Sequence, residues 1–238
     1  MSGFDTVVGR IRRAMNSGAT QEPTNSDDAH ARSPVQPELA AGELRAQFAA
    51  ALTAVGGHPI EAPDEAGAIE QIAALLHSCG LRSAALGAGI TTDSASAAAR
   101  LSREGFDVTD VPSYDGQQTG LKEALSSIDA GIVEADYGIG PTGTLVMIAH
   151  PARPRSLSLL PPINIVLLRT GRILPNLAAA LRAVGPQTIA AHPMVMVTGP
   201  SRTADIEKRI VIGVHGPKEL YVIIIPDGPA APGSAVTA

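Results

Sequence analysis

The sequence predicts an α/β fold in which helices flank a mixed sheet, and three observations carry this prediction. The first half of the chain shows helical spacing of apolar residues around one short apolar run, Ser83–Leu86, typical of a buried strand. After residue 129, apolar runs of strand length alternate with turns rich in Gly, Pro, Thr and Ser. The chain has 238 residues, of which 45% are apolar, so it can bury a substantial core. Such alternation is typical of α/β domains.

The composition divides the chain into four segments. Apolar residues with helical spacing at 1–18 predict an amphipathic N-terminal helix. Residues 19–37 are rich in Gln, Pro, Thr, Asn, Ser and Asp, which is typical of a flexible linker. We expect the compact domain at 38–226 and a disordered tail rich in Pro, Gly and Ala at 227–238.

Helices are predicted where apolar residues recur every three or four positions. The first passes through Leu44 and ends near Gly56, and the second passes through Ile69 and ends near Gly80. Pro175 is expected in the first turn of a later helix, where its missing N–H costs nothing. The remaining predicted helices cover 93–103, 121–125 and 175–184.

Strands are predicted mainly in the second half of the chain. The candidates there are 131–135, 143–149, 163–168, 194–198, 209–214 and 220–225. The turn at 215–219 contains Gly and Pro and separates the last two runs, which favours a hairpin between them.

Charge and hydropathy exclude several classes of protein. The chain carries 23 acidic and 18 basic residues with 3% aromatic residues, so no basic surface for nucleic acid is expected. The apolar run at 220–225 is far shorter than the roughly 20 residues that cross a bilayer. Residues 1–20 contain arginines in place of an apolar signal core, so we expect a soluble protein of the cytoplasm.

Cys79 is the only cysteine. One cysteine cannot form an intramolecular disulfide, and it cannot by itself hold an iron–sulfur cluster or a structural zinc ion. No histidine pair has the spacing of a helical metal site. Any redox chemistry must therefore be supplied by another protein, and we expect Cys79 to be a buried thiol at a helix end.

Two turns are candidate ligand sites. In the turn 140–144, Gly143 permits close backbone approach, and the hydroxyls of Thr142 and Thr144 could face a phosphate or carboxylate. By spacing alone, a plain β-turn explains these residues equally simply and more commonly.

The second candidate turn, 198–205, has a richer set of groups. Gly199 starts a bend after a strand, and a helix N-terminus could follow it, which would make a receptor for anions. In the alternative, Arg202 and Asp205 form an ion pair and a hydroxyl caps the helix. The side chains that could contact the ligand are Ser201, Arg202, Thr203 and Asp205.

Two further residues are candidates for catalysis. Asp136 follows a predicted strand, where α/β proteins often bind ligands, although turn aspartates are also common without a function. His215 lies in a Gly-Pro turn and is the best candidate for proton transfer, although a histidine bonded to backbone is the commoner case. The Gly87-Ala88-Gly89 run is expected to form a tight turn first and a ligand loop second.

Four segments in a fixed order resemble one known family. They are ADYGIGPTGTLVM at 135–147, RSLSLLPPINIVL at 155–167, RILP at 172–175 and TGPSRTADIEKRIVIGVHGPKELYVIII at 198–225. Together they resemble the LUD-domain family, in particular its lactate-utilisation protein C group, over roughly residues 38–226.

The resemblance implies a three-layer α/β/α domain similar to the NagB/RpiA/CoA-transferase group, here with an N-terminal helical extension. It also implies a place in bacterial systems that oxidise L-lactate to pyruvate beside two partner proteins with iron–sulfur ligands. This chain would bind no cofactor itself and would act as an accessory or ligand-binding subunit, with a small anionic metabolite as one possible ligand.

The chain departs from the family at one position. Where the family has Glu-Thr-Gly-Thr, this chain has Pro141 before Thr142. Related CoA transferases use a glutamate near such a turn as nucleophile, and proline cannot replace it. We expect Glu134, inside a predicted strand, to be a poor substitute. A different hypothesis is a freestanding enzyme that acts on a phosphorylated or carboxylated metabolite, by analogy of fold.

Overall fold

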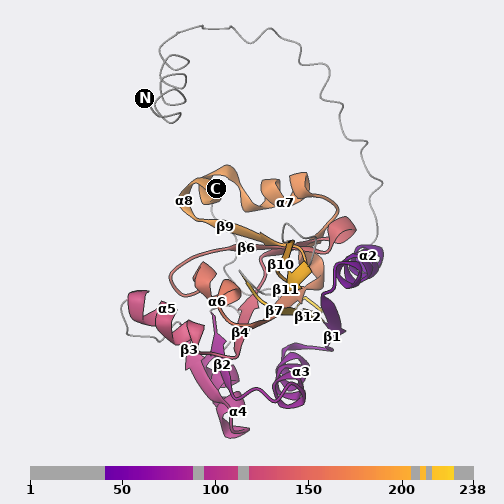
Figure 1. The fold of residues 1–238 in the computed structure, drawn as a ribbon. Coiled ribbons are helices and arrows are strands. Elements are labelled where there is room, and N and C mark those ends of the chain that lie inside the picture. The colour runs from indigo at the N-terminus through magenta and orange to yellow at the C-terminus, as the bar shows by residue number, and fades with distance from the viewer. Residues whose placement is uncertain (1–40, 88–93, 112–117, 205–209, 213–215, 228–238) are drawn as a thin grey trace, which may run out of the picture. The chain divides into compact units, whose positions relative to one another are not determined.

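The computed structural model describes residues 41–87, 94–111, 118–204, 210–212 and 216–227. These residues belong to one unit of the chain, Glu38–Ala238. The predicted helix at 1–18, the linker at 19–37 and the tail from 228 lie outside the described residues. The fold class is confirmed, because helices cover both faces of a parallel sheet (Figure 1).

The main sheet has six strands, all parallel, in the order β1-β12-β7-β4-β2-β3. Its central strands β7 and β12 are almost entirely apolar and buried, which is typical of strands covered on both faces. The strands are β1 (His58–Glu61), β2 (Ser83–Leu86), β3 (Asp107–Asp110), β4 (Ala130–Glu134), β7 (Ile163–Arg169) and β12 (Glu219–Ile225).

Each face of the main sheet has its own apolar core. One face packs against α3 (Glu65–Ser78) and α4 (Ser94–Arg103). The other packs against α2 (Ala41–Ala54), α5 (Gln118–Ser126), α6 (Arg155–Leu159) and a second sheet. Side chains alternate along β7, so even-numbered positions from 164 to 168 face the second sheet and odd-numbered positions face α3.

The second sheet has four strands in the order β8-β5-β6-β9 and is mixed. Helices α7 (Leu177–Val184) and α8 (Pro186–Ala191) lie over β6 and β9 (Figure 1). The α7 residues Ala180 and Val184 pack on Ile139 and Val146, which forms a third, smaller core. The strands are β5 (Tyr137–Ile139), β6 (Thr144–Ile148), β8 (Ile173–Leu174) and β9 (Met194–Val197), with 3₁₀ turns at Gly140–Thr142 and Thr170–Arg172.

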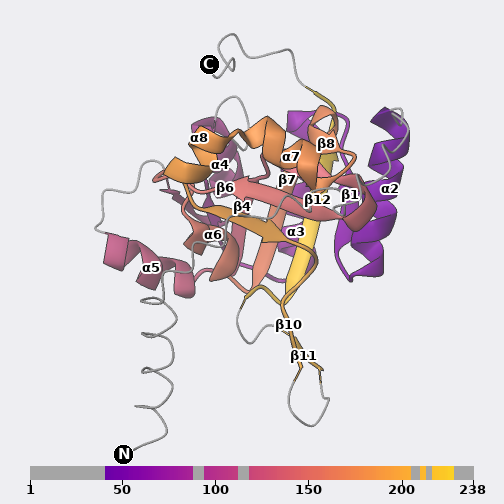
Figure 2. The ribbon, with the colours of Figure 1, turned by 90° about the horizontal axis from the view of Figure 1, so that it is seen from above.

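The predicted hairpin between the last two apolar runs is wrong. β11 (Ile210–Ile212) pairs antiparallel with β10 (Arg202–Ala204), and the two strands extend from the body (Figure 2). β12 instead lies between β1 and β7 and is parallel to both. The reason is burial: β12 is apolar on both faces, and the sheet interior is where such a strand is most stable.

Two smaller predictions also need correction. α7 begins at Leu177 rather than at Pro175, because the Asn176 side chain caps the helix by accepting a hydrogen bond from Ala179 N–H at 2.8 Å. Cys79 ends α3 as expected, but its thiol is exposed rather than buried. No helix among the described residues is long and apolar enough to cross a membrane.

The order of the strands places a switch point between β2 and β4. From β2 the chain moves outward to β3, and it then returns to β4 on the other side of β2 and continues towards β7. In parallel α/β sheets, ligands bind outside the carboxyl ends of the strands at such a point. The carboxyl ends of β2 and β4, with that of β7 on the other side of β4, are therefore the first place to look for a site.

Candidate functional site

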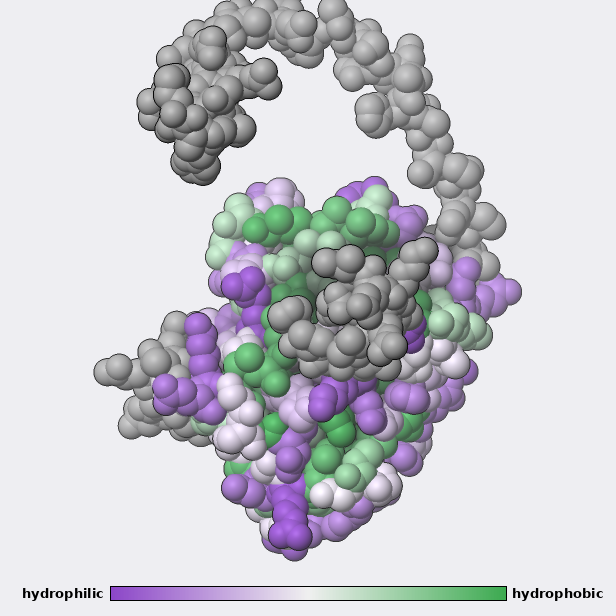
Figure 3. All heavy atoms as spheres, viewed as in Figure 1, coloured by the Kyte–Doolittle hydropathy of each residue, from purple (hydrophilic) through white to green (hydrophobic). Residues whose placement is uncertain are grey.

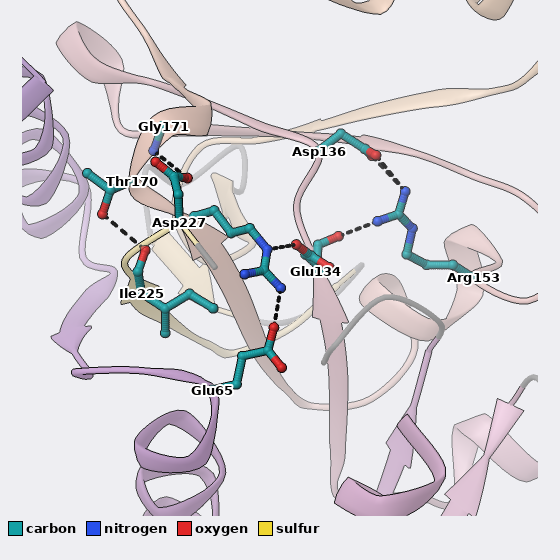
Figure 4. A network of polar contacts seen from close by, with 9 residues as sticks. Glu65, Glu134, Asp136, Arg153, Thr170, Gly171, Ile225 and Asp227 are labelled. Atoms are coloured by element: carbon teal, nitrogen blue, oxygen red, sulfur yellow. Dashed lines mark hydrogen bonds and ion pairs between the residues drawn. The ribbon is translucent and has the colours of Figure 1, made fainter. Parts of the chain in front are cut away.

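Five charged side chains form a network at the carboxyl ends of β4 and β7 (Figure 4). Arg169, at the end of β7, contacts Glu65 of α3 through Nη2 at 2.6 Å and Glu134 of β4 through Nε at 3.0 Å. Arg153 donates through Nη1 to the Glu134 carbonyl at 2.7 Å and through Nη2 to Asp136 at 2.7 Å. Both guanidinium groups are thus already paired with carboxylates.

Burial governs the electrostatics of this network. Desolvation raises the pKa of Glu134, and the nearby positive charge of Arg169 opposes that rise without cancelling it. Burial on its own would lower the pKa of Arg169, but the bonds to Glu65 and Glu134 outweigh it and raise that pKa. Glu134 therefore takes up a proton more easily, as the pH falls, than a glutamate in water does.

Asp136 is held in the network rather than presented to solvent. Its carboxylate accepts hydrogen bonds from Arg153 Nη2 through both oxygens and from Ile148 N–H at 2.6 Å. These bonds hold the start of the β5–β6 hairpin beside the loop that carries Arg153. Burial, with the charge of Arg153, lowers the pKa of the neighbouring His150. The other catalytic candidate, His215, lies outside the described residues.

The turn 140–144 packs against helix α2. Gly143 has a φ of 62°, in the left-handed region that favours glycine. A Cβ at Gly143 would come 2.4 Å from the backbone nitrogen of Leu52 in α2. Packing of α2 onto this turn therefore requires the glycine whether or not a ligand binds.

The structure brings the two predicted ligand turns together. The hydroxyl of Thr144 lies 2.7 Å from that of Thr142 and 2.8 Å from that of Thr198. The pairing of β6 with β9, in which Leu145 lies opposite Val197, sets this contact. The three hydroxyls form a hydrogen-bonded chain that joins the turn 140–144 to the bend after β9.

The bend after β9 leads into a strand instead of the predicted helix. Arg202 and Thr203 belong to β10, whose backbone pairs with β11 and so offers no helix N-terminus to an anion. The Arg202 side chain is exposed and lies against Gly56, since a Cβ there would be 2.3 Å from its Nη2. A cation beside the C-terminal end of α2 is favourable with the helix dipole. Asp205 lies outside the described residues.

Three of the predicted ligand residues line a pocket of about 220 Å³ between the two sheets and α6. Gly199 has a φ of 81° and packs on Val55, and Ser201 N–H donates to the Pro217 carbonyl at 2.9 Å. Thr198, Gly199 and Ser201 form one side of the pocket, and Ser158 and Asn164 lie among the other lining residues. No charged side chain lines the pocket within the described part of the chain.

The most conspicuous residues of the structure carry no clear signal in the sequence. Nothing in the local pattern marks Arg169 or Glu65, and the expectation that Glu134 is a poor candidate rests on its place in a strand. It is the last residue of β4, and its side chain faces Arg169. Asn164 was also missed, although one polar residue inside an apolar strand is a recognisable signal. Within the described ranges, no group of His, Cys, Asp and Glu could hold a metal ion.

A family model for the LUD domain matches residues 45–225. The chain belongs to the LUD-domain family. The residues matched by the family model include both sheets, the charged network and the pocket. Both the network and the pocket therefore lie within the LUD domain.

Two curated relatives illustrate how similar the chain is to other proteins in sequence. The chain is similar to the uncharacterized protein YkgG of Escherichia coli strain K12, with 40% identity over 101 residues that cover 41% of this chain and 44% of that protein. It is also similar to the lactate utilization protein C of Halalkalibacterium halodurans, with 31% identity over 131 residues that cover 53% and 55%. The chain thus spans about half the length of the curated relatives it matches.

A solved structure shares the fold. It is a crystal structure of a DUF162 family protein from Deinococcus radiodurans, with a TM-score of 0.58 and 23% sequence identity. The similarity covers 79% of this chain and 99% of that one, and it supports the architecture.

Proposed function

We propose that this protein serves the bacterial oxidation of L-lactate to pyruvate as a subunit without a redox centre of its own. The observation that supports this most directly is the LUD domain over 45–225, together with a relative named lactate utilization protein C. In this proposal the chain binds a small ligand or stabilises its partners, and it works beside proteins that carry iron–sulfur clusters.

The balance of the reaction explains why partners are needed. Oxidation of L-lactate to pyruvate removes two electrons and two protons from the substrate, and an acceptor must take both electrons. Cys79, the single cysteine, cannot bind an iron–sulfur cluster alone, because such clusters need several ligands. In this proposal the electrons pass to iron–sulfur clusters in the partner proteins, and each cluster accepts one electron at a time.

The test begins with the native host grown on L-lactate. The tagged protein is recovered from these cells, and the eluate is assayed for dye reduction that depends on L-lactate. We expect iron–sulfur proteins to co-elute with an activity that the isolated chain lacks. A host strain without this protein should grow on pyruvate and fail on L-lactate. Growth on L-lactate at the normal rate, with no co-eluting iron–sulfur protein, would refute the proposal.

The charged network supports a second candidate, a freestanding enzyme acting on a phosphorylated or carboxylated metabolite. Glu134 lies at the carboxyl end of β4 beside the switch point, and its raised pKa suits a group that exchanges a proton. The purified chain would be assayed with a panel of such metabolites. Turnover that is lost in Glu134→Gln and kept in Arg45→Met, a change at an exposed ion pair, would favour the enzyme.

A further inference from the structure

The pocket between the two sheets contains a buried amide whose hydrogen-bonding groups are unused. Asn164 is 1% exposed, and neither its Oδ1 nor its Nδ2 has a hydrogen-bond partner among the described residues. A buried polar group without a partner destabilises a fold, and nearly all such groups in proteins are satisfied. This amide is therefore an unusual feature to find in the middle of an apolar sheet face.

The neighbours of Asn164 place it under α6 and beside the bend after β9. Asn164 lies beside Leu220 on β12 and Gly131 on β4, and α6 fills the space above Gly131. A Cβ at Gly131 would come 2.1 Å from the Leu157 carbonyl oxygen, so the glycine lets α6 lie directly on the sheet. Asn164, Leu220 and the α6 residue Ser158 then line one pocket with the bend after β9.

The entrance to the pocket is apolar. Leu159 of α6 lines it and is unusually exposed for a large apolar side chain, at 37%. Apolar surface also gathers over α7 and α8 (Figure 3), where Leu177 and Ile189 are exposed, but neither residue lines the pocket.

We propose that this pocket binds a small, neutral, planar molecule whose edge presents a hydrogen-bond donor beside an acceptor, as a carboxamide or a nucleobase does. Asn164 offers a carbonyl acceptor beside an NH₂ donor, and side-chain amides pair with such edges through two bonds. An ionised ligand is disfavoured, because no charged side chain lines the pocket in the described ranges and burial of an unpaired charge is costly.

The volume of the pocket limits the ligand to roughly one ring. A cavity of about 150 Å³ in another protein holds benzene. The pocket here, at about 220 Å³, has space for one ring and its polar edge. The apolar residues Val195, Val197 and Leu220 then face the ring. The inference rests on this pocket alone and does not depend on a role in lactate oxidation.

The test uses the full chain, calorimetry and three probes: nicotinamide for a carboxamide, uracil for a nucleobase edge, and benzoate as an anion of similar size. We expect nicotinamide or uracil to bind and benzoate not to bind. The neutral probe that binds more tightly shows whether the pocket prefers the edge of a carboxamide or that of a nucleobase. In Asn164→Leu, binding should weaken about tenfold or more. The same variant should melt at a higher temperature, because it removes an unpaired buried amide.

A matched variant separates a binding role from a structural one. Asn176→Leu makes the same change at an amide that is bonded, since Asn176 caps α7. It should melt at a lower temperature and keep its affinity for the probe. The proposal is overturned if no neutral probe binds, if benzoate binds equally well, or if Asn164→Leu keeps full affinity. If Asn164→Leu does not fold, Leu159→Trp decides, because Leu159 lines the pocket and is exposed. It should block binding at an unchanged melting temperature, and undiminished binding would refute the site.

Discussion

Removal of the Arg169 guanidinium should destabilise the fold more than removal of any exposed cation. Arg169 joins Glu65 and Glu134, and the three side chains are 19%, 27% and 19% exposed. Breaking a fully buried ion pair costs about 3–5 kcal/mol, whereas an exposed pair contributes about 1 kcal/mol or less. The exposures of these three side chains are closer to those of a buried pair than to those of an exposed pair. Arg169→Met should therefore lower the free energy of unfolding by about 2–3 kcal/mol at pH 7.

The loss of unfolding free energy in Arg169→Met should depend on pH, because Glu134 titrates. Burial holds the pKa of Glu134 in the folded protein above the ordinary glutamate value of 4.5, and loss of the Arg169 charge should raise it further. A carboxyl group with a raised pKa favours folding at low pH and loses that contribution as the pH rises through the folded-state value. The deficit of Arg169→Met relative to wild type should therefore be largest at pH 7 and shrink as the pH approaches 4.5.

Urea unfolding followed by circular dichroism at pH 7 and pH 5 measures both effects. The double variant Arg169→Met, Glu134→Gln should recover about 1–2 kcal/mol of the loss at pH 7, because the more buried of the two carboxylates that contact Arg169 is then no longer charged. Arg45→Met is the control, since Arg45 pairs with Glu61 at exposures of 42% and 62% and should matter little. A single variant within about 0.5 kcal/mol of wild type, or a double variant no better than the single one, would refute the reasoning.

Three further predictions concern the fold around the sites. Gly131→Ala should lower the free energy of unfolding by about 1–3 kcal/mol in a thermal melt, because the new Cβ would come 2.1 Å from an α6 carbonyl oxygen. Gly42→Ala, in the first turn of α2 and with no atom beyond its own helix backbone within 4 Å, should instead raise it by roughly 0.5 kcal/mol or less. The backbone N–H of Arg82 lowers the pKa of Asp129, so wild type should lose stability as the pH falls below 3.8, and Asp129→Asn should lose less over that window. Thr198→Val breaks the threonine chain and should lower the free energy of unfolding by about 1 kcal/mol in a denaturant titration.

The sequence was most informative where local pattern and burial agree. Ser83–Leu86 is a strand with the predicted bounds, and the apolar runs at β7 and β12 were found within one residue of each end. Their composition reflects burial on both faces, which is a local property of the chain. β1 and β3 were missed because they are short edge strands with polar residues, a composition shared with loops.

Pairing and contact between distant segments could not be predicted in this way. Two apolar runs separated by a short turn fit a hairpin, but they also fit two strands that join different sheets, as β11 pairs with β10 and β12 lies between β1 and β7. The difference depends on burial, because β12 is apolar on both faces. The contact of Thr144 with Thr198 likewise depends on the register of β6 and β9. Glu134 and Arg169 end their strands, and which charges meet at a sheet edge depends on the order of the strands.

The two candidate sites should act independently, because they use opposite ends and opposite faces of the same strand. Asn164 is the second residue of β7 and faces the second sheet, whereas Arg169 is the last residue and contacts Glu65 of α3. At about 3.3 Å per residue, their Cα atoms are roughly 16 Å apart, too far for one single-ring ligand to touch both. The stability effects of Asn164→Leu and Arg169→Met should therefore add, and Arg169→Met should leave probe binding unchanged. Coupling between them would mean that β7 or the layer around it shifts as a unit when either site is altered.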